Sequence, residues 1–146
     1  ILFVNDAAAT ENITDCAGGL VGLLSIKRSE PCFINLSLSF TPSELGIGHL
    51  VEPVADVAWA GTVPRAVLES SKPVTNTVCA IAYRADFAAR LLEEFEHMPM
   101  TPVVPIDWKL NLALMQMFER GEIDAGDCWS VEPGPIVQMS MQPAGG

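Results

Sequence analysis

The sequence predicts a domain of the α/β or α+β class, and three observations support this prediction. Short apolar stretches with strand character alternate along the chain with amphipathic helical stretches. The length of 146 residues is typical of a single domain. The hydrophobic content of 49% is sufficient for a buried core and is not typical of a disordered chain.

The first half of the chain predicts two clear strands and one helix. Residues 1–4 form an unbroken apolar run that reads as a buried strand. Residues 12–28 predict a helix that ends at a basic pair followed by a proline, although its glycines weaken it. Residues 32–38 alternate with a period of two, which is typical of a strand. Proline and glycine interrupt residues 40–75, where we expect an irregular region with one strand near 54–60.

The second half alternates more regularly between the two kinds of element. Residues 77–83 are apolar and begin with β-branched side chains, which predicts a strand. Residues 85–97 follow with apolar side chains at helical spacing and with glutamates on the opposite face. Together they predict a strand that leads directly into an amphipathic helix.

A second helix is expected behind Asp107, which occupies an N-cap position, with its end at Arg120 and Gly121. Residues 127–132 then read as a short strand, and residues 136–141 as a last extended segment beyond a Pro-Gly-Pro break. The whole pattern contains no repeat and no low-complexity tract.

The charge of the chain excludes several classes of function. Acidic residues number 18 and basic residues 8, so the net charge is −10. Binding of nucleic acid or of anionic lipid surfaces depends on lysine and arginine, and such an acidic chain is poorly suited to either. The apolar runs are also far shorter than a membrane span, and no stretch has the pattern of a signal peptide.

The four cysteines are Cys16, Cys32, Cys79 and Cys128. Their wide spacing, without a CxxC pair or a nearby histidine, is not typical of a zinc site. An even count permits two disulfides, but a chain of this length does not need them. We therefore expect four reduced thiols in a cytoplasmic protein.

Asn5 and Asp6 are the first candidate site residues, because they directly follow the apolar run of residues 1–4. Open α/β sheets bind ligands at the carboxyl ends of their strands, and a carboxylate there suits a divalent cation, which prefers oxygen ligands. An Asx turn or a helix cap explains the same residues without any ligand. On the local pattern alone, the turn or cap is the favoured interpretation.

Asp107 and Trp108 form a second candidate. An aspartate at a helix N-terminus is first of all a cap that contributes about 1 kcal/mol. A carboxylate beside an aromatic ring can also act as a base or bind hydroxyl groups. Gln138 and Ser140 form a third candidate, since both lie on one side of an extended segment.

Other catalytic patterns have no support in the sequence. His49 and His97 lack a cysteine, histidine or carboxylate at ligand spacing, so both read as surface or cap residues. The chain also contains no G-x-S-x-G elbow, no P-loop and no G-x-G-x-x-G pattern. A serine hydrolase or a nucleotide-binding protein of these kinds is therefore not indicated.

Taken together, the order and spacing of the short motifs resemble the C-terminal portion of glycosyltransferase family 25, the lipopolysaccharide and collagen-type sugar transferases. The resemblance covers most of the chain and is clearest over residues 75–141. The motifs that carry it are Asn5-Asp6, residues 33–37, residues 75–84, residues 87–92, Pro105-Ile106-Asp107, Glu132-Pro133 and residues 135–140.

The resemblance implies a GT-A-like fold, that is, a Rossmann-like mixed sheet flanked by helices. It also implies a nucleotide-sugar donor, a glycan acceptor and a divalent cation, Mn²⁺ or Mg²⁺. By this likeness Asp6 binds the metal. Asn5, Asp6, Gln138 and Ser140 bind the nucleotide sugar. Asp107 is the catalytic carboxylate and binds the acceptor together with Trp108, while Tyr83 is a packing residue.

The chain departs from the family pattern at Asn5 and Ala7, where acidic residues are usual. One carboxylate fixes a divalent cation less firmly than two. This departure favours an alternative, a non-catalytic relative that binds a sugar or a partner. A structural α/β interaction module without a pocket is a third interpretation. Basic residues for the phosphates are few, namely Lys72, Arg84 and Lys109.

The beginning of the chain leads to one further expectation. Residues 1–146 start at the strand of the acidic motif, so we expect a single glycosyltransferase-like domain that lacks its N-terminal nucleotide-binding half. An incomplete sheet leaves an unpaired edge through which the domain can associate. We expect such a piece to be inactive by itself.

Overall fold

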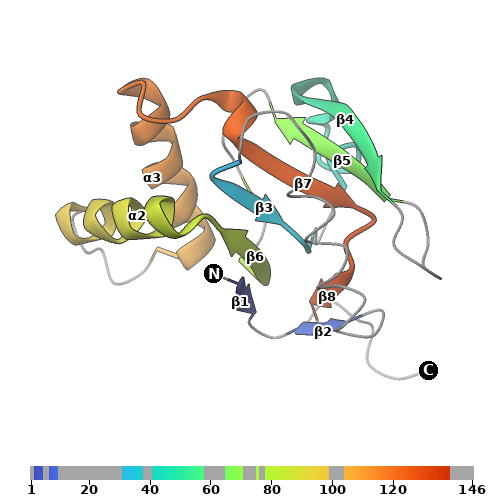
Figure 1. Cartoon of the computed structure of the whole chain (residues 1–146), viewed down its shortest axis with the longest axis horizontal. Helices are drawn as coiled ribbons and strands as arrows, with labels where there is room; N and C mark the ends of the chain where they lie inside the picture. Colours follow the sequence, from blue (N-terminus) through green and yellow to red (C-terminus); the bar gives the residue numbers. More distant parts are fainter. Residues whose placement is uncertain are drawn as a thin grey trace.

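The computed structural model describes residues 2–4, 7–9, 31–37, 41–57, 65–70, 75, 78–98 and 104–138. This part of the chain is a mixed α/β structure with a six-stranded sheet, a separate two-stranded sheet and two α-helices (Figure 1). The predicted helix over 12–28, which contains Cys16, lies outside the described residues. Lys72 lies outside them as well. The class predicted from the sequence is thus confirmed as mixed α/β.

The elements in chain order are as follows. The strands are β1 (Leu2–Val4), β2 (Ala7–Ala9), β3 (Phe33–Asn35), β4 (Val51–Val57), β5 (Arg65–Ser70), β6 (Ala80–Tyr83), β7 (Cys128–Glu132) and β8 (Ile136–Gln138). The α-helices are α2 (Ala85–His97) and α3 (Ile106–Glu119), and the short 3₁₀ turns are η1 (Gly48–Leu50) and η2 (Ala125–Asp127).

The six-stranded sheet has the strand order β1-β6-β3-β7-β5-β4. Strand β6 is antiparallel to both of its neighbours, β1 and β3, whereas β3 and β7 are parallel. Strands β1, β3 and β7 therefore run in the same direction, and their carboxyl ends lie at the same edge of the sheet. We name this the carboxyl edge.

Strands β4 and β5 form an antiparallel pair that the sequence did not predict, because a single strand near 54–60 was expected in an irregular region. The register of the pair shifts between Pro53 and Ala55. This irregularity and the proline itself obscure the alternation of apolar and polar residues. Proline is tolerated here because β4 is the outermost strand of the sheet.

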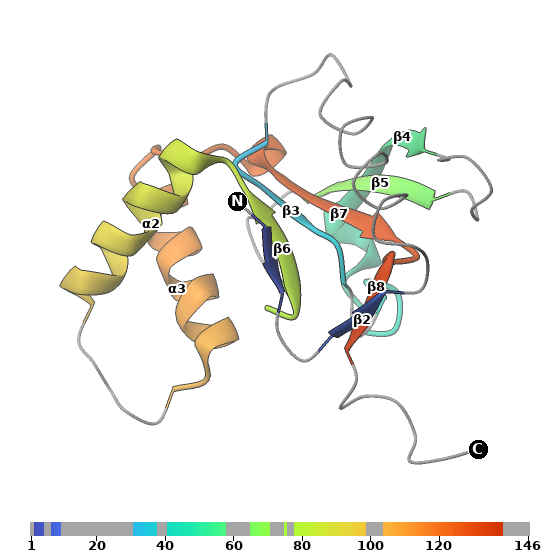
Figure 2. The same ribbon diagram turned by 60° about the horizontal axis from the view of Figure 1, so that its bottom comes forward.

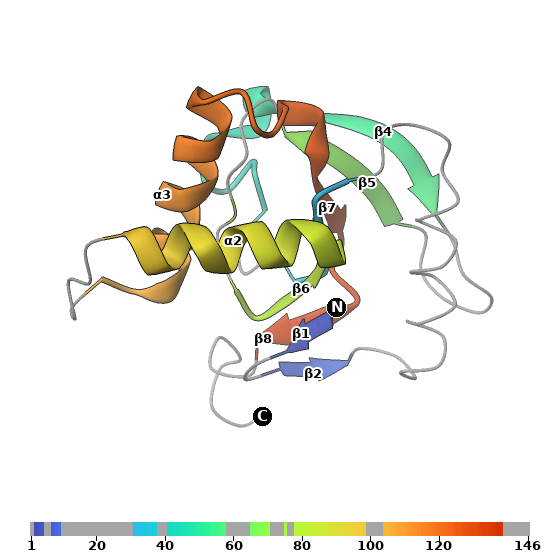
Figure 3. The same cartoon turned by 60° about the vertical axis from the view of Figure 1, so that its left-hand side comes forward.

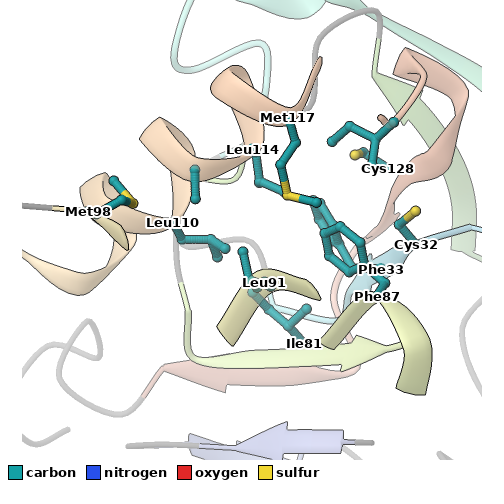
Figure 4. Packing of buried hydrophobic residues seen from close by; sticks show 12 residues of the cluster. Cys32, Phe33, Ile81, Phe87, Leu91, Met98, Leu110, Leu114, Met117 and Cys128 are labelled. Atoms are coloured by element: carbon teal, nitrogen blue, oxygen red, sulfur yellow. The ribbon is translucent and has the colours of Figure 1, made fainter. Parts of the chain in front are cut away.

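The sheet has a core on each of its faces. Both helices cover one face, as Figure 2 shows, and their buried side chains form the helix-side core (Figure 4). Phe33 and Ile81 point into this core, whereas their strand neighbours Ile34 and Ala80 point into the opposite core, as the alternation along a strand requires. The opposite core consists of Ile34, Leu36, Val67, Cys79, Ala80, Trp129, Val131 and Ile136.

Helix α2 has the bounds that the sequence predicts, and helix α3 begins differently. Its N-cap is Pro105, which makes no side-chain cap hydrogen bond, and Asp107 lies in the first turn. The prediction of Asp107 as the N-cap was therefore wrong. The end of α3 was predicted correctly: Gly121 has a φ of 70°, and its N–H donates to the carbonyl of Phe118 over 2.9 Å.

No helix in the described ranges is both long enough and apolar enough to cross a membrane.

Candidate functional site

The carboxyl edge brings together the ends of β1 and β3. Val4 is paired with Ala80, and Asn35 is paired with Ile81, so the two strand ends lie on either side of the start of β6. The hydrogen bond from the Leu36 N–H to the Ala80 carbonyl, 2.9 Å long, continues this arrangement beyond β3. Asn5 and Asp6, which follow Val4 in the sequence, lie outside the described residues.

The small sheet lies at the same edge. The Ile136 N–H of β8 donates to the Leu36 carbonyl over 3.3 Å, and Gln138 is paired with Ala7 of β2. Figures 1 and 2 show β2 and β8 beyond the end of β1, and in Figure 3 β2 lies below β1. The sequence position of Asp6 is thus between two strands, β1 and β2, that both reach this edge. Ser140 lies outside the described residues.

A buried polar network joins the carboxyl edge to helix α3. Asn35 is fully buried, and its side-chain amide donates to the Thr75 hydroxyl over 2.5 Å while its oxygen accepts the Ser37 N–H over 3.0 Å. Asn111 of α3 accepts the Thr75 N–H over 2.8 Å and donates to the Thr75 carbonyl over 2.7 Å. The side chains of Asn35 and Asn111 therefore hold Thr75 from two sides.

Sequence reasoning missed this network. One signal for it was present, since Asn35 is a polar residue in the middle of an otherwise apolar strand. Asn111 was less visible, because a single asparagine in an amphipathic helix is an ordinary surface residue. The pairing of both residues with Thr75 depends on the tertiary fold.

The Ser37 side chain adds one unusual feature to this edge. It is fully buried, and its hydroxyl has no hydrogen-bond partner within the part of the chain that the structure describes. A buried hydroxyl without a partner destabilises the folded state by about 1–3 kcal/mol. Nearby Asn35, in contrast, has hydrogen-bond partners for its side chain. Ser37 is therefore an unpaired but fully buried polar group beside the carboxyl edge, within the described residues.

Asp107 lies one helical turn before Asn111, so both residues project from the same side of α3. Its carboxylate is half-buried and makes no hydrogen bond or ion pair in the described ranges. Trp108, the next residue, is 68% exposed, so its indole ring is accessible from solvent. Asp107 can accept a hydrogen bond from a hydroxyl group on the side of α3 that carries Asn111.

Gln138 approaches this edge from the other face of the sheet. Its strand β8 places Ile136 in the opposite core, whereas α3, which carries Asp107, packs on the helix side. The structure therefore brings the end of β1, Asn35, Thr75 and Asn111 together. It places Asp107 and Gln138 on elements that cover opposite faces.

Arg84 does not lie at the carboxyl edge, contrary to its proposed use for phosphates. Its N–H donates to the Cys32 carbonyl over 2.9 Å, which places it at the amino end of β3. Its guanidinium forms an ion pair with Asp86, with an Nε–Oδ1 distance of 2.6 Å. The hydrogen bond that the Arg84 guanidinium donates to Asp86 lowers the pKa of the Asp86 carboxyl. The Arg84 guanidinium is thus bound to Asp86 at the N-terminus of α2, away from the carboxyl edge.

Tyr83 lies in the helix-side core, as its interpretation as a packing residue predicts. Its ring stacks on Phe87 with a centroid separation of 6.4 Å and an angle of 23° between the ring planes. Burial raises the pKa of its hydroxyl to about 12. The ring therefore stays neutral at physiological pH.

A metal site is not visible in the described ranges, which contain no group of three or more histidine, cysteine or acidic side chains that could hold an ion. Asp6, the predicted metal ligand, is outside these ranges. Comparisons of the chain with protein-family models, with curated proteins and with solved structures gave no match.

Proposed function

We propose that the chain is part of a GT-A-type glycosyltransferase that moves a sugar from a nucleotide-sugar donor to an acceptor hydroxyl. One observation carries this proposal. The carboxyl edge gathers the end of β1, just before Asp6, and the Asn35–Thr75–Asn111 network, which links this edge to the helix of Asp107. The carboxyl edge is where open α/β sheets bind ligands.

The residues of this site have separate tasks in the proposal. Asn5, Asp6, Gln138 and Ser140 bind the nucleotide sugar, and Asp6 holds a divalent cation, Mn²⁺ or Mg²⁺, which supplies positive charge beside the diphosphate. Asp107 and Trp108 face the acceptor. The polar network of Asn35 and Asn111 fixes α3, and with it Asp107, against the carboxyl edge.

The reaction at this site is a substitution at the anomeric carbon of the donor. The acceptor oxygen forms the new bond to that carbon, and the bond from the carbon to the diphosphate oxygen breaks. The diphosphate leaves with the electron pair, and Asp107 takes the proton of the acceptor hydroxyl. Charge that develops on the diphosphate needs a positive partner.

A second candidate function is a non-catalytic relative that binds a sugar or a partner. Ala7 stands where the family has an acidic residue, and in the structure it is paired with Gln138 in the small sheet. Asp107 and Gln138 also reach the carboxyl edge from opposite faces. Both features favour binding over transfer.

Two further parts of the proposal concern location and association. The described cysteines Cys32, Cys79 and Cys128 are free, which supports a reducing, cytoplasmic environment. Strand β1 is an outer strand of the six-stranded sheet, so further strands or a partner can pair with it.

The test uses the full-length protein. It is titrated by calorimetry with UDP-glucose, UDP-galactose and GDP-mannose, with and without Mn²⁺, and sugar transfer is then followed with a panel of sugar acceptors. We expect Asp6→Asn to abolish the Mn²⁺-dependent part of binding. Asp107→Asn is expected to keep donor binding and to lower transfer at least 100-fold.

The matched control is Glu119→Gln, which removes one exposed carboxylate from the same helix as Asp107. It should change neither binding nor transfer. Donor binding without transfer to any acceptor would favour the non-catalytic relative. The absence of binding to all three nucleotide sugars would contradict the transferase and would leave only binding of a free sugar or of a partner for the non-catalytic relative.

A further inference from the structure

An apolar pocket of about 310 Å³ lies between the two helices and β6. Its inner wall is made of Leu91 and Leu110, which are buried in the helix-side core. Its rim is made of Leu92 and Ile106, which are 63% and 54% exposed. The pocket therefore connects the core with the molecular surface beside the first turn of α3.

The size and lining of the pocket define the kind of ligand that it can hold. A volume of this size is at the lower end of the range for small-molecule sites, which is roughly 300–1,000 Å³. Every lining side chain is aliphatic or aromatic, with Tyr83 and Phe95 as the aromatic members. A single alkyl chain or one ring fits these dimensions, whereas a free sugar would leave its hydroxyl groups unpaired.

A shallower hollow adjoins the mouth of the pocket. It shares Leu92, Phe95 and Ile106 with the pocket and adds Glu96 from α2 and Lys109 from α3. One acid and one base line this hollow beside apolar side chains, so an uncharged group suits it better than an anion or a cation. Ile106 directly precedes Asp107, the candidate acceptor-side carboxylate.

We propose that this pocket holds the apolar aglycone of the acceptor, so that the acceptor is an uncharged amphiphile. Its sugar or hydroxyl head lies at Asp107, and its alkyl or aryl tail lies between α2 and α3. This inference rests on the transferase function proposed above, which it deepens by naming the class of acceptor. The new bond forms at the head, and the tail takes no part in the chemistry.

The experiment measures binding of glucose and of hexyl, heptyl and octyl β-D-glucosides to the full protein, below the micelle concentrations of the glucosides. Each added methylene that enters the pocket is expected to tighten binding about fourfold. Glucose itself is expected to bind at least tenfold more weakly than hexyl glucoside. Asp107→Asn should weaken the glucosides but not n-octanol, because octanol lacks the sugar head.

Two neighbouring alanines of α2 provide a matched pair of variants. Ala88 lines the pocket and Ala89 is exposed, so Ala88→Phe fills the pocket and Ala89→Phe adds the same ring elsewhere. Ala88→Phe is expected to remove the dependence on chain length, and Ala89→Phe to keep it. Leu92→Asn is a second test at a rim position that is 63% exposed, and it should weaken octyl glucoside several-fold.

The outcomes separate this inference from the proposed function. Affinity that does not change with chain length, or that Ala88→Phe and Leu92→Asn leave intact, would overturn the pocket assignment even if the protein binds nucleotide sugars. A chain-length dependence without any nucleotide-sugar binding would overturn the transferase proposal and the acceptor role of the pocket. Chain-length dependence together with Mn²⁺-dependent donor binding would support both.

Discussion

The side-chain amide of Asn35 donates a hydrogen bond of 2.5 Å to the hydroxyl of Thr75, 40 residues further along the chain. Asn35 ends β3, and Thr75 precedes β6 by a few residues. Both side chains are buried, so the bond is shielded from water. It fixes two distant chain segments at the carboxyl edge, where the candidate site lies.

We expect Asn35→Ala to lower the free energy of unfolding by about 2–4 kcal/mol, because it removes two buried hydrogen bonds, one to the Thr75 hydroxyl and one from the Ser37 N–H. Urea denaturation followed by circular dichroism measures this change. Gln116→Ala, on the half-buried surface of α3, serves as the control and should cost less than 1 kcal/mol. A cost below 0.5 kcal/mol for Asn35→Ala would show that the network contributes nothing to stability.

Alkaline pH should destabilise the fold through its buried thiols. Burial, together with nearby Asp127, raises the pKa of the Cys32 thiol from its ordinary value of 9.0 to about 11, and burial raises that of Cys128 further. As pH rises, the unfolded chain therefore loses these protons before the folded chain does. The contribution of the protonated thiols to the free energy of unfolding is fully present below pH 9 and declines as pH rises toward 11. The expected loss is about 1.4 kcal/mol per pH unit for each thiol.

Denaturation experiments at pH 8, 9, 10 and 11 measure this slope, and the double variant Cys32→Ala/Cys128→Ala should make it shallower, with buried Tyr83 responsible for part of what remains. The same burial predicts slow reaction of both thiols with iodoacetamide in the native state, since only the thiolate reacts. Rapid labelling under native conditions at pH 8 would contradict this prediction.

Arg120 should stabilise the contact between the two helices in a salt-dependent way. Its guanidinium binds Glu94 of α2 with an Nη2–Oε2 distance of 2.6 Å, and it also binds Glu122, which in turn contacts Arg90. We expect Arg120→Ala to lower Tm at low ionic strength and to have a smaller effect in 1 M NaCl, because Arg120 and Glu122 are exposed and salt screens them, whereas Glu94 is half-buried.

The same ion pairs predict a loss of stability in acid. Hydrogen bonding to Arg120, and then to Arg90, lowers the pKa of Glu122 below its ordinary value of 4.5. The stabilising effect of Glu122 is therefore present above pH 4.5 and is lost as pH falls below that value. Thermal scans from pH 7 to pH 3 should show a smaller decrease in Tm for Glu122→Gln than for the native chain.

Two leucines of α3 allow the same substitution to be tested in two environments. Leu114 is fully buried in the helix-side core, whereas Leu112 is 51% exposed. Leu114→Ala is expected to cost about 2–5 kcal/mol, and Leu112→Ala about 1 kcal/mol or less. Equal costs in urea denaturation would contradict the orientation of α3 against the sheet.

Gly121 should be more costly to replace than Gly48. Gly121 ends α3 with a φ of 70°, and a Cβ atom added there would meet no atom within 4 Å. The expected cost of Gly121→Ala, about 1 kcal/mol, is therefore purely conformational. Gly48, which lacks a positive φ, provides the comparison, and an equal effect of both alanines on stability would contradict this explanation.

Elements with a strong local pattern were predicted well from the sequence. Helix α2 has its predicted bounds because its apolar spacing is regular and because strand residues precede it directly. Strand β7 also lies within the range 127–132 that the sequence predicts for it. The pair β4–β5 was missed because Pro53 and the shifted register disturb the alternation.

The candidate site was less predictable, because its residues meet only in the folded chain. Asn111 is 36 residues away from Thr75, so no local pattern indicates their contact. Arg84 was proposed for phosphates, but the antiparallel direction of β6 places it at the edge opposite to the carboxyl edge. Asp107 was placed at the N-cap, whereas Pro105 occupies that position.

The position of β6 between β1 and β3 has a consequence for the order of assembly. Leu2 finds its partner only at Ala82, and Phe33 finds its two partners at Tyr83 and Cys128. As the chain leaves the ribosome, β1 and β3 stay unpaired in this sheet until β6 has been made, whereas β4 and β5 can pair earlier. The half of the sheet that contains β1, β6 and β3 therefore forms from contacts between distant residues, and such topologies fold slowly.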